Sequence, residues 1–117
     1  MLHEPGVAAS RTGLTLDTLR YYERESIIGP IARDTGGRRR YSDDDLAWIG
    51  IVTCLRDAGL GIDDLRRFAT LLRSDTADGA DRVEFLRRRR TELLEQQERT
   101  ARALKVLDDK ITYYSNH

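Results

Sequence analysis

The sequence predicts a mostly α-helical fold: a winged helix-turn-helix domain with a small β-hairpin wing, followed by one long C-terminal helix. Three observations predict it. Apolar residues recur at helical spacing along most of the 117-residue chain. A Gly-Gly pair lies between two arms of an arginine-rich stretch. Neither proline nor glycine occurs from residue 80 to residue 114. We therefore expect a domain over residues 1–75, a linker over 76–79 and the long helix over 80–117.

The first two helices are predicted from their end signals. Pro5 can open a helix, because its missing N–H has no helical partner there. Gly13 ends that helix, since glycine tolerates the left-handed conformation. Thr15 is a good N-cap for the next helix, Asp17 adds negative charge in its first turn, and the helix runs to about Glu25. Two short helices around a glycine-containing turn form a helix-turn-helix.

The next segment is predicted to be a β-hairpin. Residues 31–33 and 38–41 form its arms, and Gly36 and Gly37 at the tip permit positive φ angles. Arg38, Arg39 and Arg40 follow the tip directly. These three guanidiniums could lie on a solvated hairpin, but their mutual repulsion favours an anionic partner.

A second pair of helices follows the hairpin. Ser42 is the expected N-cap of the first, ahead of three aspartates. Its apolar face comprises Leu46, Ile49, Val52 and Leu55, widened by Trp48 and Ile51. Glycines at 59 and 61 end it, and the next helix opens at Ile62 or Asp63. The inward side chains of that helix are Leu65, Phe68, Leu71 and Leu72.

The long C-terminal helix carries a heptad pattern that is apolar at both ends and polar in the centre. The predicted dimerisation residues are Val83, Leu86, Leu93, Leu104, Leu107, Ile111 and Tyr114. At ~1.5 Å per residue the helix is roughly 50 Å long, and one helix cannot bury such a narrow stripe alone. We expect a homodimeric coiled coil. Apolar ends suit an antiparallel pair, although the sequence alone does not fix the orientation.

Composition narrows the function classes. Net charge is zero, but residues 1–41 carry seven arginines against five acids, and a DNA-binding surface needs only local positive charge. The single cysteine, Cys54, excludes an intrachain disulfide and favours the reducing cytoplasm. No run of residues suits a membrane span or a signal peptide. The only histidines, His3 and His117, lie near the termini, so we expect no metal site, no cofactor and no enzymatic activity.

These pieces resemble the MerR family of transcription regulators. The resemblance lies in residues 6–9, 12–15 and 18–23, the last reading Thr-Leu-Arg-Tyr-Tyr-Glu, and in a wing with Arg33, the two glycines and residues 39–41. It covers essentially the whole chain. Arg38 departs from the family, which more often has an aromatic residue after the glycines. The resemblance implies dimers that bind double-stranded promoter DNA and bend and untwist an overlong spacer, so that RNA polymerase engages both promoter elements.

DNA contact is expected from the second helix and the wing. The N-terminal end of a recognition helix faces base edges, and arginine and tyrosine further along suit phosphates. The predicted DNA-binding residues are Thr15, Asp17, Thr18, Arg20, Tyr21, Arg33, Arg38, Arg39, Arg40 and Tyr41. Thr15 has an alternative role as a cap alone, Asp17 as a complement to the helix dipole, and Tyr41 as a core residue. Tyr22 is expected in the core beside Leu19.

Cys54 is the predicted sensor residue. The segment 54–62 resembles the branch of the family that responds to aldehydes or nitrosative stress through one thiol. Both reactions need an accessible thiolate. The alternative is a small buried side chain, which its apolar neighbours Ile51 and Ala58 favour. Two further functions stay open: a constitutive regulator without a thiol switch, and a coiled-coil scaffold that does not bind DNA.

Overall fold

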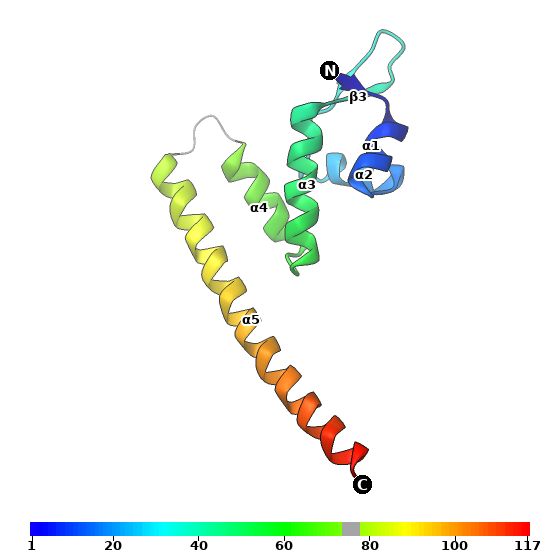
Figure 1. Cartoon of the computed structure of the whole chain (residues 1–117). Coiled ribbons are helices and arrows are strands. Elements are labelled where there is room, and N and C mark those ends of the chain that lie inside the picture. The colour runs from blue at the N-terminus through cyan, green and yellow to red at the C-terminus, as the bar shows by residue number, and fades with distance from the viewer. Residues whose placement is uncertain (74–77) are drawn as a thin grey trace. The chain divides into compact units, whose positions relative to one another are not determined.

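The computed structural model describes residues 1–73 and 78–117 (Figure 1). It confirms the predicted fold class. The elements are β1 (Leu2–His3), α1 (Pro5–Thr12), α2 (Leu16–Arg24), β2 (Ala32–Arg33), β3 (Arg39–Ser42), α3 (Asp43–Asp57), α4 (Ile62–Leu72) and α5 (Gly79–Ser115). The chain divides into two compact units, Met1–Ala77 and Asp78–His117. Of the predicted linker, residues 76 and 77 lie outside the described residues, while Asp78 and Gly79 are the N-cap and first residue of α5.

The helix-turn-helix forms through the predicted end signals. Gly13 adopts a left-handed conformation with φ of 73°, and its N–H donates to the carbonyl of Ala9 over 3.0 Å. Thr15 Oγ1 accepts a hydrogen bond from the Thr18 N–H at 3.1 Å, which caps α2. Both helix ends are thus satisfied within the turn itself, and the start of α2 is fixed by local chemistry.

The wing is the hairpin of β2 and β3, and its sheet has a third strand. Ala32 pairs with Arg40 and Arg33 with Arg39, while β1 pairs with the other edge of β3 and sets His3 opposite Tyr41. Strand β1 is only two residues long and was not predicted from the sequence. His3, near the N-terminus, is buried, with 7% of its surface exposed.

The hydrophobic core of the first unit lies between the helix-turn-helix, the sheet and α3. Figure 1 shows α3 lying between the α1–α2 pair and α4. Leu19, Ile27, Ile49, Val52 and Leu65 are all fully buried. Each such side chain contributes roughly 1.5–3 kcal/mol of burial free energy. This core holds α2 and the wing on one scaffold.

The start of α3 is a capping box. Ser42 Oγ accepts from the Asp45 N–H, and an Asp45 carboxylate oxygen accepts from the Ser42 N–H, both at 2.9 Å. Trp48 Nε1 donates to the carbonyl of Ile27 over 2.8 Å, and the Trp48 ring stacks on Phe68 at 5.5 Å between centroids. These contacts fix α3 against the segment after α2 and against α4.

One face of α3 corrects the sequence analysis. Ile51 is 47% exposed, and Cys54 is also exposed, so the burial expected from their apolar neighbours was wrong. The inward residues are Ile49 and Val52. Ile51 and Cys54 each follow one of them by two residues, which is about 200° of helical rotation. Their side chains therefore point away from the core.

Helix α5 is a continuous helix of 37 residues in which no residue is buried. Its N-cap is Asp78, whose carboxylate accepts from the Ala80 N–H at 3.1 Å. Six of the seven predicted dimerisation residues are exposed, from 41% at Leu86 to 71% at Tyr114, and Leu93 is half-buried. None of the described helices combines the length and the apolar character that a membrane span requires.

Candidate nucleic-acid interface

A cleft of about 370 Å³ lies among the N-terminal end of α1, helix α2 and the wing. Among the described residues its charged lining consists of one carboxylate and five arginines: Glu4, Arg20, Arg33, Arg38, Arg39 and Arg40. This excess of positive charge is local, because the chain as a whole is neutral. Such a cleft attracts anions.

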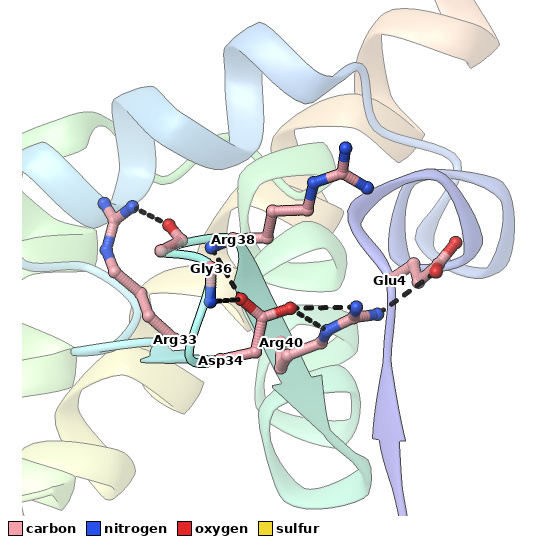
Figure 2. A network of polar contacts seen from close by, with 7 residues as sticks. Glu4, Arg33, Asp34, Gly36, Arg38 and Arg40 are labelled. Carbon is pink, nitrogen blue, oxygen red and sulfur yellow. Dashed lines mark hydrogen bonds and ion pairs between the residues drawn. The ribbon is translucent and has the colours of Figure 1, made fainter.

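Asp34 shapes the wing (Figure 2). Its Oδ1 accepts hydrogen bonds from the backbone N–H groups of Gly36, at 2.9 Å, and Arg38, at 3.0 Å. An aspartate that accepts from its own turn is an Asx-type arrangement, which stabilises a tight reversal. Gly37 completes the tip with φ of 82°. The glycines of the tip were predicted from the sequence, whereas the hydrogen bonds of Asp34 were not, although aspartate is a common turn residue.

Arg40 links the wing to the start of α1. Its Nε and Nη2 donate to Asp34 Oδ2 at 3.1 and 2.9 Å, and its Nη1 is 3.3 Å from Glu4 Oε1. The pKa of Asp34 is lowered, first by the Arg38 N–H and then by the Arg40 guanidinium. The pKa of Arg40 is raised by Asp34 and then by Glu4. All three guanidinium nitrogens of Arg40 face carboxylates of the chain.

Arg39 is also paired within the chain. Its Nε donates to Glu23 Oε1 at 2.7 Å, and Glu23 Oε2 accepts from the Ile31 N–H at 3.2 Å. Glu23 therefore ties the last turn of α2 to both arms of the hairpin. The sequence offered no signal for this pairing, because the two residues are 16 positions apart.

Arg33 and Arg38 present their charge differently. Arg33 Nη1 donates to the Gly37 carbonyl at 2.8 Å, and its side chain is exposed. The Arg38 side chain extends away from Asp34 and Arg40 (Figure 2) and forms no ion pair with the described residues. Of the three consecutive arginines, Arg38 is thus the one with a guanidinium open to a partner.

The first turn of α2 presents short polar groups. Thr15 is exposed and its hydroxyl donates to Thr18 Oγ1 at 2.9 Å, in addition to capping the helix. The Asp17 carboxylate is 94% exposed and lies 3.3 Å from Arg20 Nη1. The cap and the dipole-complementing position are therefore both present. Neither excludes contact with a base edge.

The three tyrosines of α2 and β3 have different environments. Tyr21 is half-buried, with the Arg24 guanidinium 5.9 Å from its ring centroid. Tyr22 is 3% exposed, in agreement with its expected core position. Tyr41 is 1% exposed, and burial raises the pKa of its hydroxyl. A buried Tyr41 corresponds to the core-packing alternative, so we leave it out of the DNA contacts proposed below.

Two other features bear on ligands. Cys54 lies on the exposed face of α3 and is not among the residues that line the cleft. His3 Nε2 lies 2.6 Å from Asp43 Oδ1. Over residues 1–73 and 78–117, no three His, Cys, Asp or Glu side chains converge as a metal site.

Comparison with known proteins identifies the family. The pattern described as MerR HTH family regulatory protein matches residues 5–72, which is more than half of the chain. This chain belongs to the MerR family. It is therefore a DNA-binding transcription regulator with the helix-turn-helix and wing of that family. The match spans α1 to the end of α4 and includes every residue of the predicted DNA-binding set.

MerR-type relatives extend the similarity beyond the matched region. An uncharacterised HTH-type transcriptional regulator of Haemophilus influenzae is 30% identical over 97% of this chain and 84% of its own length. The regulator AdhR of Bacillus subtilis is 39% identical over 74% of this chain, which spans 62% of AdhR.

Solved MerR structures match the whole chain. A putative family member from Listeria monocytogenes superposes with a TM-score of 0.89 at 36% identity, covering 98% of this chain and 87% of that protein. HiNmlR, described as a family regulator lacking the sensor domain and bound to promoter DNA, gives 0.87 at 28% identity, covering 99% and 92%. The similarity therefore includes α5 as well as the helix-turn-helix and the wing.

Proposed function

We propose that this chain acts as a homodimer that binds double-stranded promoter DNA and distorts the spacer between the two polymerase elements. The observation that supports it most is the arginine-lined cleft between α2 and the wing. A helix-turn-helix presents α2 to the major groove, and a flanking wing meets the phosphates. HiNmlR, which resembles the chain over nearly its full length, is described as bound to promoter DNA.

The contacts divide by position. Thr15, Asp17 and Thr18 lie in the first turn of α2 and face base edges. Arg20 and Tyr21 follow on α2 and reach phosphates. On the wing, Arg33 and Arg38 contact phosphates, because their guanidiniums are the exposed ones. Arg39 and Arg40 serve as anchors of the wing, since both are paired with carboxylates of the chain.

The dimer forms through α5. Six of the seven heptad residues are exposed in the single chain, and a 37-residue helix with no buried residue needs a partner surface. A second copy supplies the same stripe. The two DNA-binding units then meet successive half-sites on one face of the duplex.

Spacer distortion is the step that links binding to transcription. Dimers of this family bend and untwist an overlong spacer, and RNA polymerase then engages both promoter elements. The polymerase is thus a partner through the DNA. Part of the specificity comes from the energy needed to deform the spacer rather than from base contacts.

A salt series tests the DNA contacts. Arg38→Ala is expected to lower the magnitude of the slope of log K against log salt by about one, and to weaken binding to all DNA sequences alike. The matched control is Arg102→Ala, which removes the same charge from α5, where Arg102 pairs with Glu98. Affinity is measured with the DNA upstream of the gene by fluorescence anisotropy. Equal slopes for Arg38→Ala and the unmodified protein contradict the assignment, and no selective binding at any salt favours the scaffold alternative.

We further propose that modification of Cys54 switches the regulator. The exposed position of this thiol on α3 supports the proposal, because an electrophile or a nitrosating agent needs access. The resemblance to the single-cysteine branch of the family points to an aldehyde. The competing function is a constitutive regulator whose Cys54 has no signalling role.

In vitro transcription separates these two functions. The unmodified protein should change promoter output on addition of formaldehyde, whereas Cys54→Ser should bind the same DNA with unchanged affinity and give no change in output. Ser10→Ala, which also alters an exposed residue, serves as the control variant. A full response in Cys54→Ser contradicts the thiol switch and points to another target for the aldehyde, whereas no response in the unmodified protein favours the constitutive regulator.

A further inference from the structure

We propose that Asp34 and Glu4 are positioning residues, which hold the wing in its DNA-binding position through Arg40, and that Arg40 itself does not bind DNA phosphate. This inference rests on the proposed function, because it concerns how the wing of that interface is held. It assigns different tasks to neighbouring arginines that the sequence does not distinguish.

The first argument is the occupancy of the Arg40 guanidinium. Nε and Nη2 donate to Asp34 Oδ2, and Nη1 faces Glu4 Oε1 at 3.3 Å. Asp34 thus occupies two of the five N–H donors, and a phosphate at Nη1 would compete with Glu4. The Arg40 side chain is also only 24% exposed, and that of Asp34 only 29%. The Glu4 side chain is 66% exposed, so Asp34, with two charge-assisted hydrogen bonds, is the stronger partner of Arg40.

The second argument is what the chain of contacts connects. Asp34 follows β2 and caps the turn through two backbone N–H groups. Glu4 follows β1 and is the N-cap residue of α1. The contacts from Asp34 through Arg40 to Glu4 thus join the wing tip to the start of the helix-turn-helix (Figure 2). The wing is set relative to the helix-turn-helix before DNA arrives, which lowers the ordering cost of binding.

The third argument is the contrast with Arg38. Its side chain points away from the Asp34–Arg40 pair and forms no ion pair with the described residues (Figure 2). The Arg38 backbone N–H is nevertheless held by Asp34 Oδ1 at 3.0 Å. Asp34 therefore fixes the backbone from which the free guanidinium extends. One carboxylate neutralises Arg40 and aims Arg38.

A double-mutant cycle on DNA affinity tests the division of roles. The variants are Asp34→Asn, which keeps an oxygen acceptor and removes the charge, Arg40→Gln, and the two combined. If Arg40 acts through Asp34, each single change weakens binding by about fivefold, and the combination is no weaker than Arg40→Gln alone. The salt slope stays that of the unmodified protein in all three, whereas Arg38→Gln lowers it by about one.

A phosphate contact by Arg40 gives a different pattern and overturns the proposal. Arg40→Gln then lowers the salt slope by about one, and Asp34→Asn tightens binding because it frees the guanidinium. A multiplicative loss of about 25-fold in the double variant also overturns it, since the two residues then act independently.

Hydrogen exchange on the free protein separates failure of this inference from failure of the proposed function. We expect the amides of Gly36 and Arg38 to exchange about fivefold faster in Arg40→Gln than in the unmodified protein. The control is Arg102→Gln, which breaks an ion pair on α5 and should leave both amides unchanged. If the Gly36 and Arg38 amides exchange faster in Arg40→Gln but the protein binds no DNA, the role of Arg40 in holding the wing is supported and the DNA-binding function is rejected. If the exchange rates of these two amides are unchanged in Arg40→Gln, the proposal that Asp34 and Arg40 hold the wing is rejected.

Discussion

The unit Met1–Ala77 buries thirteen apolar side chains among its described residues, whereas α5 in the second unit buries none. Both contain helices with apolar stripes of similar residue types. In the first unit the stripes of α2, α3 and α4 meet around Leu19, Ile49 and Leu65. In α5 the stripe meets no other part of its own unit. The first unit has a core of its own, and the proposed dimer would supply the partner surface that the stripe of α5 lacks within its unit.

The difference also determines how each region depends on concentration. Contacts within one chain stabilise it to the same extent at any protein concentration, while contacts between copies do not. The free energy of the first unit therefore belongs to the monomer. In the proposed dimer, the free energy contributed by α5 depends on protein concentration.

The largest effect is expected in the core of the first unit. Leu19 is fully buried, so Leu19→Ala should lower the free energy of unfolding by about 3 kcal/mol through lost transfer energy and a residual cavity. Leu16 on the same helix is 36% exposed, and Leu16→Ala should lower it by less than about 1 kcal/mol. Urea unfolding followed by Trp48 fluorescence measures both. Equal losses at the two positions contradict the assigned core.

A smaller effect is expected on α5, and it should appear in association rather than in monomer folding. Leu107→Ala is predicted to raise the dimer dissociation constant by at least about 30-fold, equivalent to about 2 kcal/mol. Val106 has nearly the same exposure, 58% against 57%, but lies outside the predicted stripe. Val106→Ala should change the constant by less than about threefold. Sedimentation equilibrium distinguishes them, and equal effects reject the heptad assignment.

The capping box gives a third effect. Ser42→Ala removes the hydroxyl that accepts from the Asp45 N–H and should destabilise the first unit by about 1 kcal/mol. Ser42→Asp retains an acceptor at the N-cap and should recover most of the loss. Thermal unfolding at two protein concentrations checks that the change lies in the monomer. A loss that disappears at high concentration places the effect in the dimer instead.

The smallest effect is a pH dependence. The pKa of Asp34 is lowered by the Arg38 N–H and Arg40, and that of Asp43 by the His3 hydrogen bond and the N-terminus. A carboxyl whose folded-state pKa is lowered stabilises the fold above its unfolded value, about 3.9 for aspartate. That contribution is lost as the pH falls through the lower folded-state values. The urea midpoint of unfolding should fall as the pH is lowered below about 4, and it should fall less steeply with pH in Asp34→Asn. An equally steep fall in this variant contradicts the contribution assigned to Asp34.

Local chemistry explains what the sequence could predict. Thr15, Ser42 and Gly13 end or begin helices through atoms within three or four residues, so their roles can be read along the chain. The helical period in the same way predicted the long helix and most of the core. For this reason the fold class, the helix-turn-helix and the hairpin could all be predicted.

Distant pairing explains what the sequence could not predict. Arg39 meets Glu23 across 16 residues, and His3 meets Asp43 across 40. No spacing rule links such positions, so the anchoring of the wing and strand β1 were missed. The sequence left open whether Cys54 is exposed or buried, because an apolar neighbour one turn away does not tell which face of a widened stripe lies inward.

The junction between β3 and α3 has a mechanical consequence. Ser42 is the last residue of the strand and also the N-cap of the helix, so no flexible residue separates the two elements. Capping hydrogen bonds in both directions stiffen this joint. If the proposed dimer bends its DNA, a torque on the wing would be transmitted directly to the axis of α3, because no loop lies between the two elements.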